Sequence, residues 1–428
     1  MASSTDLLMR RYLTSAVEQG LSSILNLGVN LVLIRLVTPE DYGVFVFWGA
    51  LGYVMASVQN AVSVCHLQVT PFGPGFEAQR ARVESVMAGV NLVFLAAVGV
   101  VALLAALALR SLGNDLGATA GAVYLVAFLA QQYGRALRFS RRDVIAATAR
   151  TGAVLVLAAA GLTAAALAAG TDGLSAEQAL LILAGAYGAV VLWGAWSPAV
   201  REIVSGLVSS LRAYGPYARE SGWIFLGVAS TEVLARFYVF AVAGTAGAVA
   251  LATLSATQLL LRPPALLASS WAMAARPDLV ARREAGDAKG LAWLLSLAAL
   301  GGVVVTGVWT SAVVVAWPFI SGHVFGGKYL GEAGLVMLWG LCAATSFVQI
   351  VINTGLQSIK AFKALALANA GASLIAMSAI LVGLNLAGPR GAVLGTAVGQ
   401  AAEAAAMAAL LIVLLRRGHG TARQSALR

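Results

Sequence analysis

The stretch LTSAVEQGLSSILNLGVNLVLIRLVTPEDYGVF, residues 13–45, decides the fold class. It holds one long apolar segment, a tight turn that is expected to end at Gly43, and the start of a second apolar segment. A helix of about 20 apolar residues spans the hydrocarbon core of a bilayer. The strict alternation typical of a transmembrane β-strand is absent from this sequence. The stretch therefore predicts two membrane-spanning helices joined by a short turn.

The rest of the chain has the same character. Its 428 residues are 60% hydrophobic and only 11% charged, whereas soluble globular proteins carry about 25% charged residues. This composition excludes a soluble fold and predicts an all-α polytopic membrane protein. Twelve transmembrane helices are expected, at residues 12–35, 43–66, 85–109, 117–137, 150–170, 178–198, 221–242, 247–271, 291–318, 334–358, 364–386 and 391–415.

Lysine and arginine are distributed unevenly between the two sides of this predicted topology. Of the 28 basic residues, 22 fall in the terminal segments and alternate loops, 4 fall in the other loops, and Arg236 and Arg262 lie within spans. Cytoplasmic loops carry an excess of Lys and Arg, so both termini are expected in the cytoplasm. The net charge of +10 then follows from a topology that faces anionic head groups. No nucleic-acid partner is expected.

The two halves of the chain share an order of elements. Aligning residues 42–44 (Tyr-Gly-Val) with 246–248 (Ala-Gly-Ala) places a helix, a turn ending in glycine and a second helix in corresponding positions. Parallel repeats of this kind occur in transporters, where one bundle rocks against the other and gives alternating access. We expect two six-helix pseudo-repeat lobes, residues 1–214 and 215–428.

Several stretches carry a family resemblance. In STEVLARFYVFAVAGTAGAVALATLSATQLLLRPP (230–264), an acidic residue and then an arginine precede a glycine-containing turn, and GPRGAVLGTAVGQAAEAAA (388–406) opens with a glycine turn followed by a helix of small residues. Together with residues 13–45 and 325–374, they resemble bacterial polysaccharide-export and O-antigen-type flippases of the multidrug/oligosaccharidyl-lipid/polysaccharide transporter superfamily. The resemblance implies a V-shaped twelve-helix transporter that moves an undecaprenyl-diphosphate-linked oligosaccharide to the outer leaflet.

Two departures refine the expected substrate. Val29 and Asn30 stand where the lipid II flippase branch carries an Arg-Asp pair, and twelve spans are expected rather than fourteen. A polysaccharide repeat unit is therefore expected rather than lipid II. The resemblance implies a bacterial inner-membrane protein of lipopolysaccharide or exopolysaccharide biosynthesis that works as a monomer among membrane lipids. Polysaccharide polymerase and chain-length proteins are its implied partners, and no cofactor is expected.

Polar side chains within the spans mark the candidate substrate site, because such groups are costly in hydrocarbon. Arg262 and Arg236 suit a lipid diphosphate, since a guanidinium donates two hydrogen bonds to phosphate oxygens. The alternatives are snorkelling of Arg262 from a helix end broken by the prolines that follow it, and a purely structural ion pair of Arg236 with Glu232. Neutral amides suit sugar hydroxyls or hold helices together; they are Gln258, Asn26, Asn30, Gln349 and Asn353.

Three carboxylates within spans are candidates for coupling to a proton or cation gradient. Glu18 shares a polar helix face with the two asparagines of its span, and it either couples transport or bonds neighbouring helices near the inner head groups. Glu232 lies four residues before Arg236 and can pair with it on one helix face. Glu403 stands in a run of alanines, with packing and coupling both open. Arg135, at an inner helix end, is interpreted as a topology signal.

Two other function classes remain as alternatives. A MATE-like drug or metabolite cation antiporter of the same superfamily would favour acidic groups in its cavity, and the in-span charges do not decide against it. A membrane-embedded polysaccharide polymerase or glycosyltransferase is expected to carry catalytic residues on a sizeable outer loop, and the longest outer loop here, 319–333, is short. An enzyme is therefore not expected. No metal site is expected either, because the three histidines lie in different compartments.

Overall fold

The computed structural model describes residues 4–71, 73, 75–111, 117–170, 173–195, 206–359 and 361–425. Within these residues the chain is almost entirely helical, and the β-type pairing is limited to one isolated bridge between Val37 and Leu174. The prediction of an all-α fold is confirmed. Nine helical segments of the described chain are long and apolar enough to cross a membrane, and the protein is a multi-pass membrane protein.

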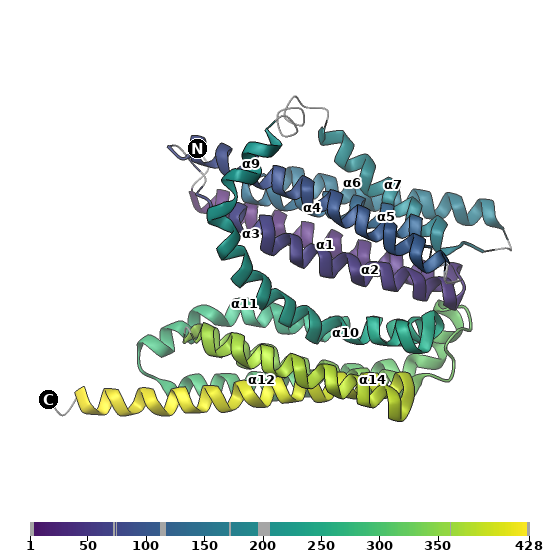
Figure 1. Cartoon of the computed structure of the whole chain (residues 1–428). Helices are drawn as coiled ribbons and strands as arrows, with labels where there is room; N and C mark the ends of the chain where they lie inside the picture. Colours follow the sequence, from purple (N-terminus) through teal and green to yellow (C-terminus); the bar gives the residue numbers. More distant parts are fainter. Residues whose placement is uncertain are drawn as a thin grey trace. The chain divides into compact units, whose positions relative to one another are not determined.

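The chain divides into two compact units, Met1–Ala229 and Ser230–Arg428. In the first unit the long helices run along one another (Figure 1). Its elements are α1 (Ser4–Leu36), α2 (Pro39–Gln59), the π-helical η1 (Asn60–Val64), α3 (Cys65–Val69), α4 (Glu77–Ser111), α5 (Ala118–Ser140), α6 (Val144–Ala169), α7 (Ala176–Ala195), α9 (Leu207–Ala213) and the first part of α10 (Gly215–Leu259).

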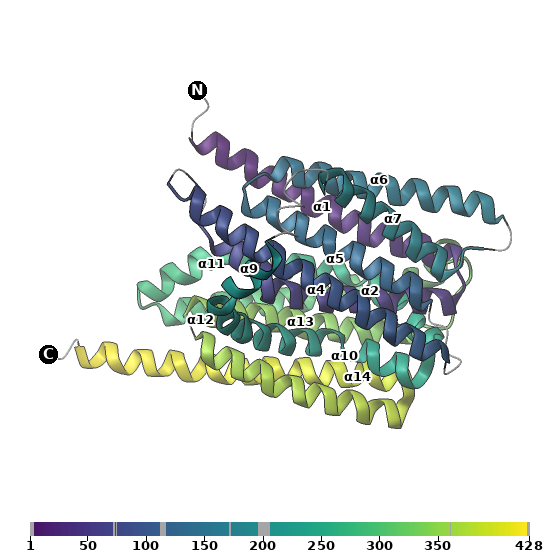
Figure 2. The same cartoon turned by 45° about the horizontal axis from the view of Figure 1, so that its top comes forward.

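The second unit is built in the same way from long helices that lie along one another (Figure 2). The division between the units falls inside α10, between Ala229 and Ser230, whereas the boundary expected at 214/215 lies at the first residue of that helix. The elements of this unit are the rest of α10, α11 (Arg262–Glu284), α12 (Ala288–Phe319), the π-helical η2 (Ile320–Val324), α13 (Ala333–Ser358) and α14 (Phe362–Ser425).

Two long helices each contain a break that separates two of the predicted spans. α10 is interrupted at Gly247, which has a φ of 81°. α14 is interrupted at Ala387 and Gly388, and the φ of Gly388 is 60°. Glycine adopts such positive φ angles without the clash that a Cβ atom causes. Each break divides one long helix into two of the predicted spans. α5, which carries charges at one end, is a further predicted span. Counted in this way, the described helices correspond to the twelve predicted spans.

The turn between the first two spans lies earlier than expected. α1 ends at Leu36 and α2 begins at Pro39, so Val37 and Thr38 form the turn. Thr38 is the N-cap, and its hydroxyl accepts a hydrogen bond from the backbone N–H of Asp41 at 3.1 Å. Proline suits the first helical position because its ring fixes φ near the helical value. It lacks an N–H, but the N–H groups of the first turn have no acceptor within the helix, so no hydrogen bond is lost. Gly43 is buried inside α2, so the alignment of Gly43 with Gly247 as turn residues is wrong.

Glycine allows two helices of the first unit to approach closely. A Cβ atom at Gly121 on α5 would lie 2.0 Å from the indole ring of Trp48 on α2. Beside this contact the ring of Phe128 packs edge-on against Tyr53, with ring centroids 5.6 Å apart, and against Tyr187, at 5.5 Å. These aromatic contacts join α2, α5 and α7 into one core.

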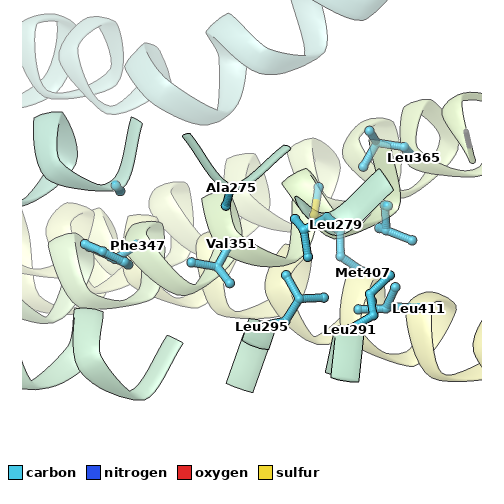
Figure 3. Close-up of a cluster of buried hydrophobic side chains, with 11 residues drawn as sticks. Ala275, Leu279, Leu291, Leu295, Phe347, Val351, Leu365, Met407 and Leu411 are labelled. Atoms are coloured by element: carbon cyan, nitrogen blue, oxygen red, sulfur yellow. The ribbon is translucent and has the colours of Figure 1, made fainter. Parts of the chain in front are cut away.

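The second unit has an apolar core at one end of its bundle, which Figure 3 shows in close-up. Side chains from α11, α12, α13 and α14 point toward one another there, and the buried members are Ala268, Ala275, Leu279, Leu291, Leu295, Phe347, Val351, Leu356, Leu365, Met407 and Leu411. In a soluble protein, burying one large apolar side chain stabilises the fold by about 1.5–3 kcal/mol. In a bilayer, where the surrounding lipid is also apolar, van der Waals packing between the helices supplies the stabilisation instead.

The two arms of α14 pack through small residues. A Cβ atom at Gly395 would lie 2.5 Å from the carbonyl oxygen of Ala379, and one at Gly399 would lie 2.3 Å from the Cβ of Ala376. Gly391 and Gly383 face each other in the same way. Helices in membranes associate closely where small residues meet, so the hairpin within α14 is held by backbone-to-backbone contact.

Candidate functional site

Glu18 is fully buried in the first unit and bound by an arginine. Both its carboxylate oxygens accept from Arg135 on α5, at 2.6 Å from Nε and 2.6 Å from Nη2. The hydroxyl of Thr151 on α6 donates to the same carboxylate at 2.8 Å. The residue therefore links α1, α5 and α6. Sequence reasoning missed this pair because it treated Arg135 as a topology signal only.

The two asparagines of α1 bond to tyrosines of α2. The amide of Asn26 donates to the hydroxyl of Tyr53, and the hydroxyl of Tyr42 donates to Oδ1 of Asn30 at 2.8 Å. The Nδ2 of Asn30 donates to the backbone carbonyl of Asn26 at 2.7 Å. The polar face predicted for the first span thus divides, with Glu18 directed at α5 and α6 and the amides directed at α2.

In the second unit, Tyr238 joins the polar residues of α10 to those at the start of α11. Its buried hydroxyl donates to Oε1 of Gln258 at 2.7 Å, and both Arg236 and Arg262 lie within electrostatic range of it. Nε of Arg236 donates to Glu232 at 2.8 Å, which is the pairing expected from their spacing. The structure therefore pairs Arg236 with Glu232 and bonds Gln258 to Tyr238, a residue that sequence reasoning missed.

The helix break beside Arg262 precedes the two prolines. α10 ends at Leu259, and α11 begins at Arg262 with the prolines in its first turn. A helix break at these prolines was expected, and the observed break lies before them. Proline is tolerated in the first turn of a helix, whereas in the helix interior it removes a backbone hydrogen bond, so the new helix begins at the prolines. The carbonyl of Leu260, freed by the break, accepts from the indole N–H of Trp309 at 2.8 Å. Arg262 is exposed at this helix start.

Glu403 forms a second polar site within the same unit, and its side chain is only 2% exposed. Gln349 on α13 donates to Oε2 of Glu403. With its amide oriented to satisfy its hydrogen bonds, Asn369 donates to Oε1 at 3.0 Å and to the carbonyl of Leu365 at 3.1 Å. No ion pair within the described residues involves Glu403. Its donors are neutral amides, unlike those of Glu18 and Glu232.

The remaining amides of α13 lie toward one end of the helix. Gln357 donates to Oδ1 of Asn353 at 2.9 Å, and Arg276 on α11 donates to Oε1 of Gln357 at 2.8 Å. The amides of α13 therefore divide at Asn353, with Gln349 directed to the buried carboxylate and Gln357 directed to an arginine. Among the described residues no group of histidine, cysteine and acidic side chains could hold a metal ion.

Comparison with solved structures identifies the fold. No protein-family model matches the chain, and no curated protein matches it in sequence. The lipid II flippase MurJ in an inward closed conformation superposes with a TM-score of 0.68 at 12% identity, covering 92% of this chain and 86% of that one. An inward-facing multidrug resistance MATE family transporter of the MOP superfamily superposes with a TM-score of 0.64 at 12% identity, covering 95% and 99%.

A eukaryotic MATE transporter, AtDTX14, superposes with a TM-score of 0.55 at 14% identity and covers 97% of both chains. These proteins are transporters and flippases by their descriptions, and at such low identity the likeness concerns the fold. The chain thus has the helical fold that MATE transporters and the MurJ flippase share.

Proposed function

We propose that this protein is a flippase that moves an undecaprenyl-diphosphate-linked oligosaccharide across the cytoplasmic membrane of a bacterium by alternating access. The observation that carries the proposal is that the charges of Arg236 and Arg262 both lie within electrostatic range of the buried Tyr238 hydroxyl. Two guanidinium groups inside the spans of one unit suit a diphosphate, whose oxygens accept charge-assisted hydrogen bonds in pairs.

Neutral hydrogen-bonding groups in the same unit support a sugar-bearing substrate. Gln258 keeps its amide N–H donors while its carbonyl oxygen accepts from Tyr238. In the same unit, Asn353 lies on α13 with its carbonyl oxygen bound by Gln357 and its own amide nitrogen as a further donor. Amides and hydroxyls complement sugar hydroxyls, which both donate and accept.

The fold likeness to MurJ supports this proposal, because that protein is described as a flippase of lipid II. Its substrate is thus a lipid, and its fold covers most of this chain. We assign a polysaccharide repeat unit to this protein, since Val29-Asn30 stands in place of an Arg-Asp pair.

The decisive experiment measures flipping in proteoliposomes that contain the purified full chain and a fluorescent undecaprenyl-diphosphate oligosaccharide. We expect Arg262→Ala and Arg236→Ala to lose most of the flipping while their abundance stays near normal. Lys289→Ala, which removes an exposed cation at the start of α12, is the matched control and should flip normally. Normal flipping by both arginine variants would refute the diphosphate contact.

A MATE-like cation antiporter is the second candidate, and the Glu403 site favours it. This carboxyl group is buried among neutral amides without a basic partner in the described residues, so it can bind a proton or a small cation. The MATE fold likeness points in the same direction. Export of a cationic dye by the proteoliposomes, with no flipping of the lipid, would favour this second function.

Coupling to an ion gradient is proposed for either function, and three carboxylates compete for the role. Glu18 and Glu232 are each bound by an arginine, which competes with a proton or cation for the carboxylate. The comparison of Glu18→Gln, Glu232→Gln and Glu403→Gln identifies the coupling residue. Transport by the coupling variant should no longer respond to an imposed pH or sodium gradient, while the other two keep that response.

A further inference from the structure

The arginine-rich end of the first unit holds a half-buried cation without a counter-charge of its own. Arg150 lies in the second turn of α6, and its guanidinium lies beside Gly134 on α5, where a Cβ atom would be 3.9 Å from Nη1. This separation is an ordinary van der Waals contact, so the guanidinium lies close to α5 at this point. The positive-inside distribution assigns this end of the unit to the cytoplasmic face.

The neighbouring acidic groups are bound by other arginines. Arg138 donates to Asp143 at 3.0 Å, and Arg141 binds the carboxylate of Glu84 through both nitrogens of one edge. Arg150 experiences the attraction of Asp143 and the repulsion of Arg138, yet it makes no hydrogen bond or ion pair with the described residues. Two guanidinium groups thus share one carboxylate at the α5–α6 junction, and one positive charge is left over.

Burial distinguishes Arg150 from three other cations at this end that make no ion pair within the described residues. Arg82, Arg212 and Arg219 also make no hydrogen bond or ion pair within the described residues, but they are exposed, whereas Arg150 is half-buried. Water can solvate the exposed three fully. A partly desolvated guanidinium beside a like charge gains most from an external anion that accepts hydrogen bonds.

The surface around Arg150 indicates that the anion belongs to a lipid. Leu157 lies two turns along α6 on the same face as Arg150 and is 43% exposed. An acyl chain can therefore lie along α6 while its head group reaches the arginines. Basic pockets between helices on the cytoplasmic side are the form in which membrane proteins bind anionic head groups.

We propose that Arg150 and Arg138 form a binding site for the phosphodiester of an anionic phospholipid of the inner leaflet. The guanidinium of Arg150 donates to the phosphate oxygens, and Arg138 adds charge from the side of Asp143. This site lies in the first unit, and it is independent of the substrate proposed for the arginines of the second unit.

The test uses the purified full chain in a neutral detergent and measures thermal unfolding as short-chain phospholipid is added. Dioctanoyl phosphatidylglycerol should raise the unfolding midpoint of the wild-type chain saturably, and dioctanoyl phosphatidylcholine should not. One surface cation contributes to lipid binding by an amount that corresponds to about a fivefold change in affinity. We therefore expect Arg150→Gln to bind phosphatidylglycerol about fivefold more weakly, with Arg82→Gln as the matched control of unchanged affinity.

Two further arms keep the result interpretable. Arg150→Lys retains the charge and should keep most of the affinity, which separates loss of binding from damage to the fold. Inorganic phosphate and glycerol 3-phosphate test whether a free anion suffices. The proposal is overturned if the wild-type chain shows no saturable response to phosphatidylglycerol, or if Arg150→Gln and Arg82→Gln bind it equally well. It is also overturned if free phosphate stabilises the chain at the same concentration as the lipid.

Discussion

Gln349 on α13 donates a hydrogen bond to Glu403 on α14, and this contact joins two helices of the second unit through a buried carboxyl group. Asn369, on the other arm of α14, donates to the second oxygen of the same group. Without the carboxyl group, Gln349 would lose this acceptor and Asn369 would keep only the carbonyl of Leu365. The site is thus an interhelical junction as well as a place where a proton or cation can bind.

Removal of this acceptor should destabilise the second unit. A buried donor without a partner costs about 1–3 kcal/mol, so Glu403→Ala should unfold at a clearly lower temperature than the wild type in detergent. Glu403→Gln keeps one acceptor oxygen and should lose less. Equal melting temperatures for the alanine variant and the wild type would contradict the contacts described.

The Glu18–Arg135 pair should contribute more to the stability of the fold than a neighbouring ion pair that is open to solvent. Removing one partner of a buried ion pair costs about 3–5 kcal/mol because the other charge is left uncompensated. Arg135→Gln leaves Glu18 without its cation, and Glu18 is fully buried. Arg138→Gln is the control, since the side chain of its partner Asp143 is 46% exposed. We expect a much larger fall in unfolding temperature for Arg135→Gln, and similar values for the two variants would argue against this ranking.

The glycine contacts inside α14 allow a test with matched substitutions. A methyl group at Gly395 meets the backbone of Ala379, which cannot move aside, so Gly395→Ala should destabilise the unit by about 1–3 kcal/mol. Gly371, in the same helix, has open space around its Cβ position. Gly371→Ala should therefore be neutral, or stabilising by up to about 1 kcal/mol through helix propensity. Thermal unfolding of both variants checks the contrast, and a stable Gly395→Ala would refute the close approach.

Tyr238→Phe should weaken transport without affecting abundance. The substitution keeps the ring that packs on Trp339, with centroids 5.1 Å apart, and it removes the hydrogen bond to Gln258. One such bond contributes about 0.5–1.5 kcal/mol, so a loss of severalfold in apparent substrate affinity is expected in the proteoliposome assay. An unchanged affinity would mean that Gln258 needs no orientation by the tyrosine.

Tyr329 in the loop before α13 gives a prediction for alkaline pH. Burial raises the pKa of its hydroxyl to about 12, whereas an unfolded tyrosine has a pKa of about 10. The folded state therefore favours the neutral form, and stability that is complete below pH 10 falls as the pH rises toward 12. Tyr329→Phe should lose less stability over this range. Its hydroxyl is also buried without a hydrogen-bond partner in the described residues, so the variant should be at least as stable at neutral pH. Unfolding measured from pH 8 to 11 tests both points.

The sequence predicted the helices well because membrane spans depend on local apolar composition. The breaks at Gly247 and Gly388 also follow local rules, since both residues adopt positive φ angles. The first turn was misplaced although the signal was present: Thr38 and Pro39 are an N-cap and a first helical residue, and they outweigh the glycine four positions later.

The pairing of polar residues was harder to predict. Glu232 and Arg236 are four apart on one helix, so their spacing sufficed. Arg135 lies 117 positions from Glu18, and their contact depends on how α1 and α5 are rotated in the bundle. Rotation is set by packing of side chains along both helices, which single-sequence patterns do not encode. The link between Gln349 and Glu403 escaped prediction for the same reason.

The glycine contacts of α14 also set the rotational phase of Glu403. Gly391, Gly395, Gly399 and Glu403 follow at intervals of four residues, so each lies one turn after the last on a ridge that winds slowly around the helix. Insertion or deletion of a single residue between Gly399 and Glu403 would turn the carboxyl group by about 100° about the helix axis. It would then leave the amides of Gln349 and Asn369 even though the hairpin stayed intact. The four-residue spacing between Gly399 and Glu403 is therefore required for the Glu403 site.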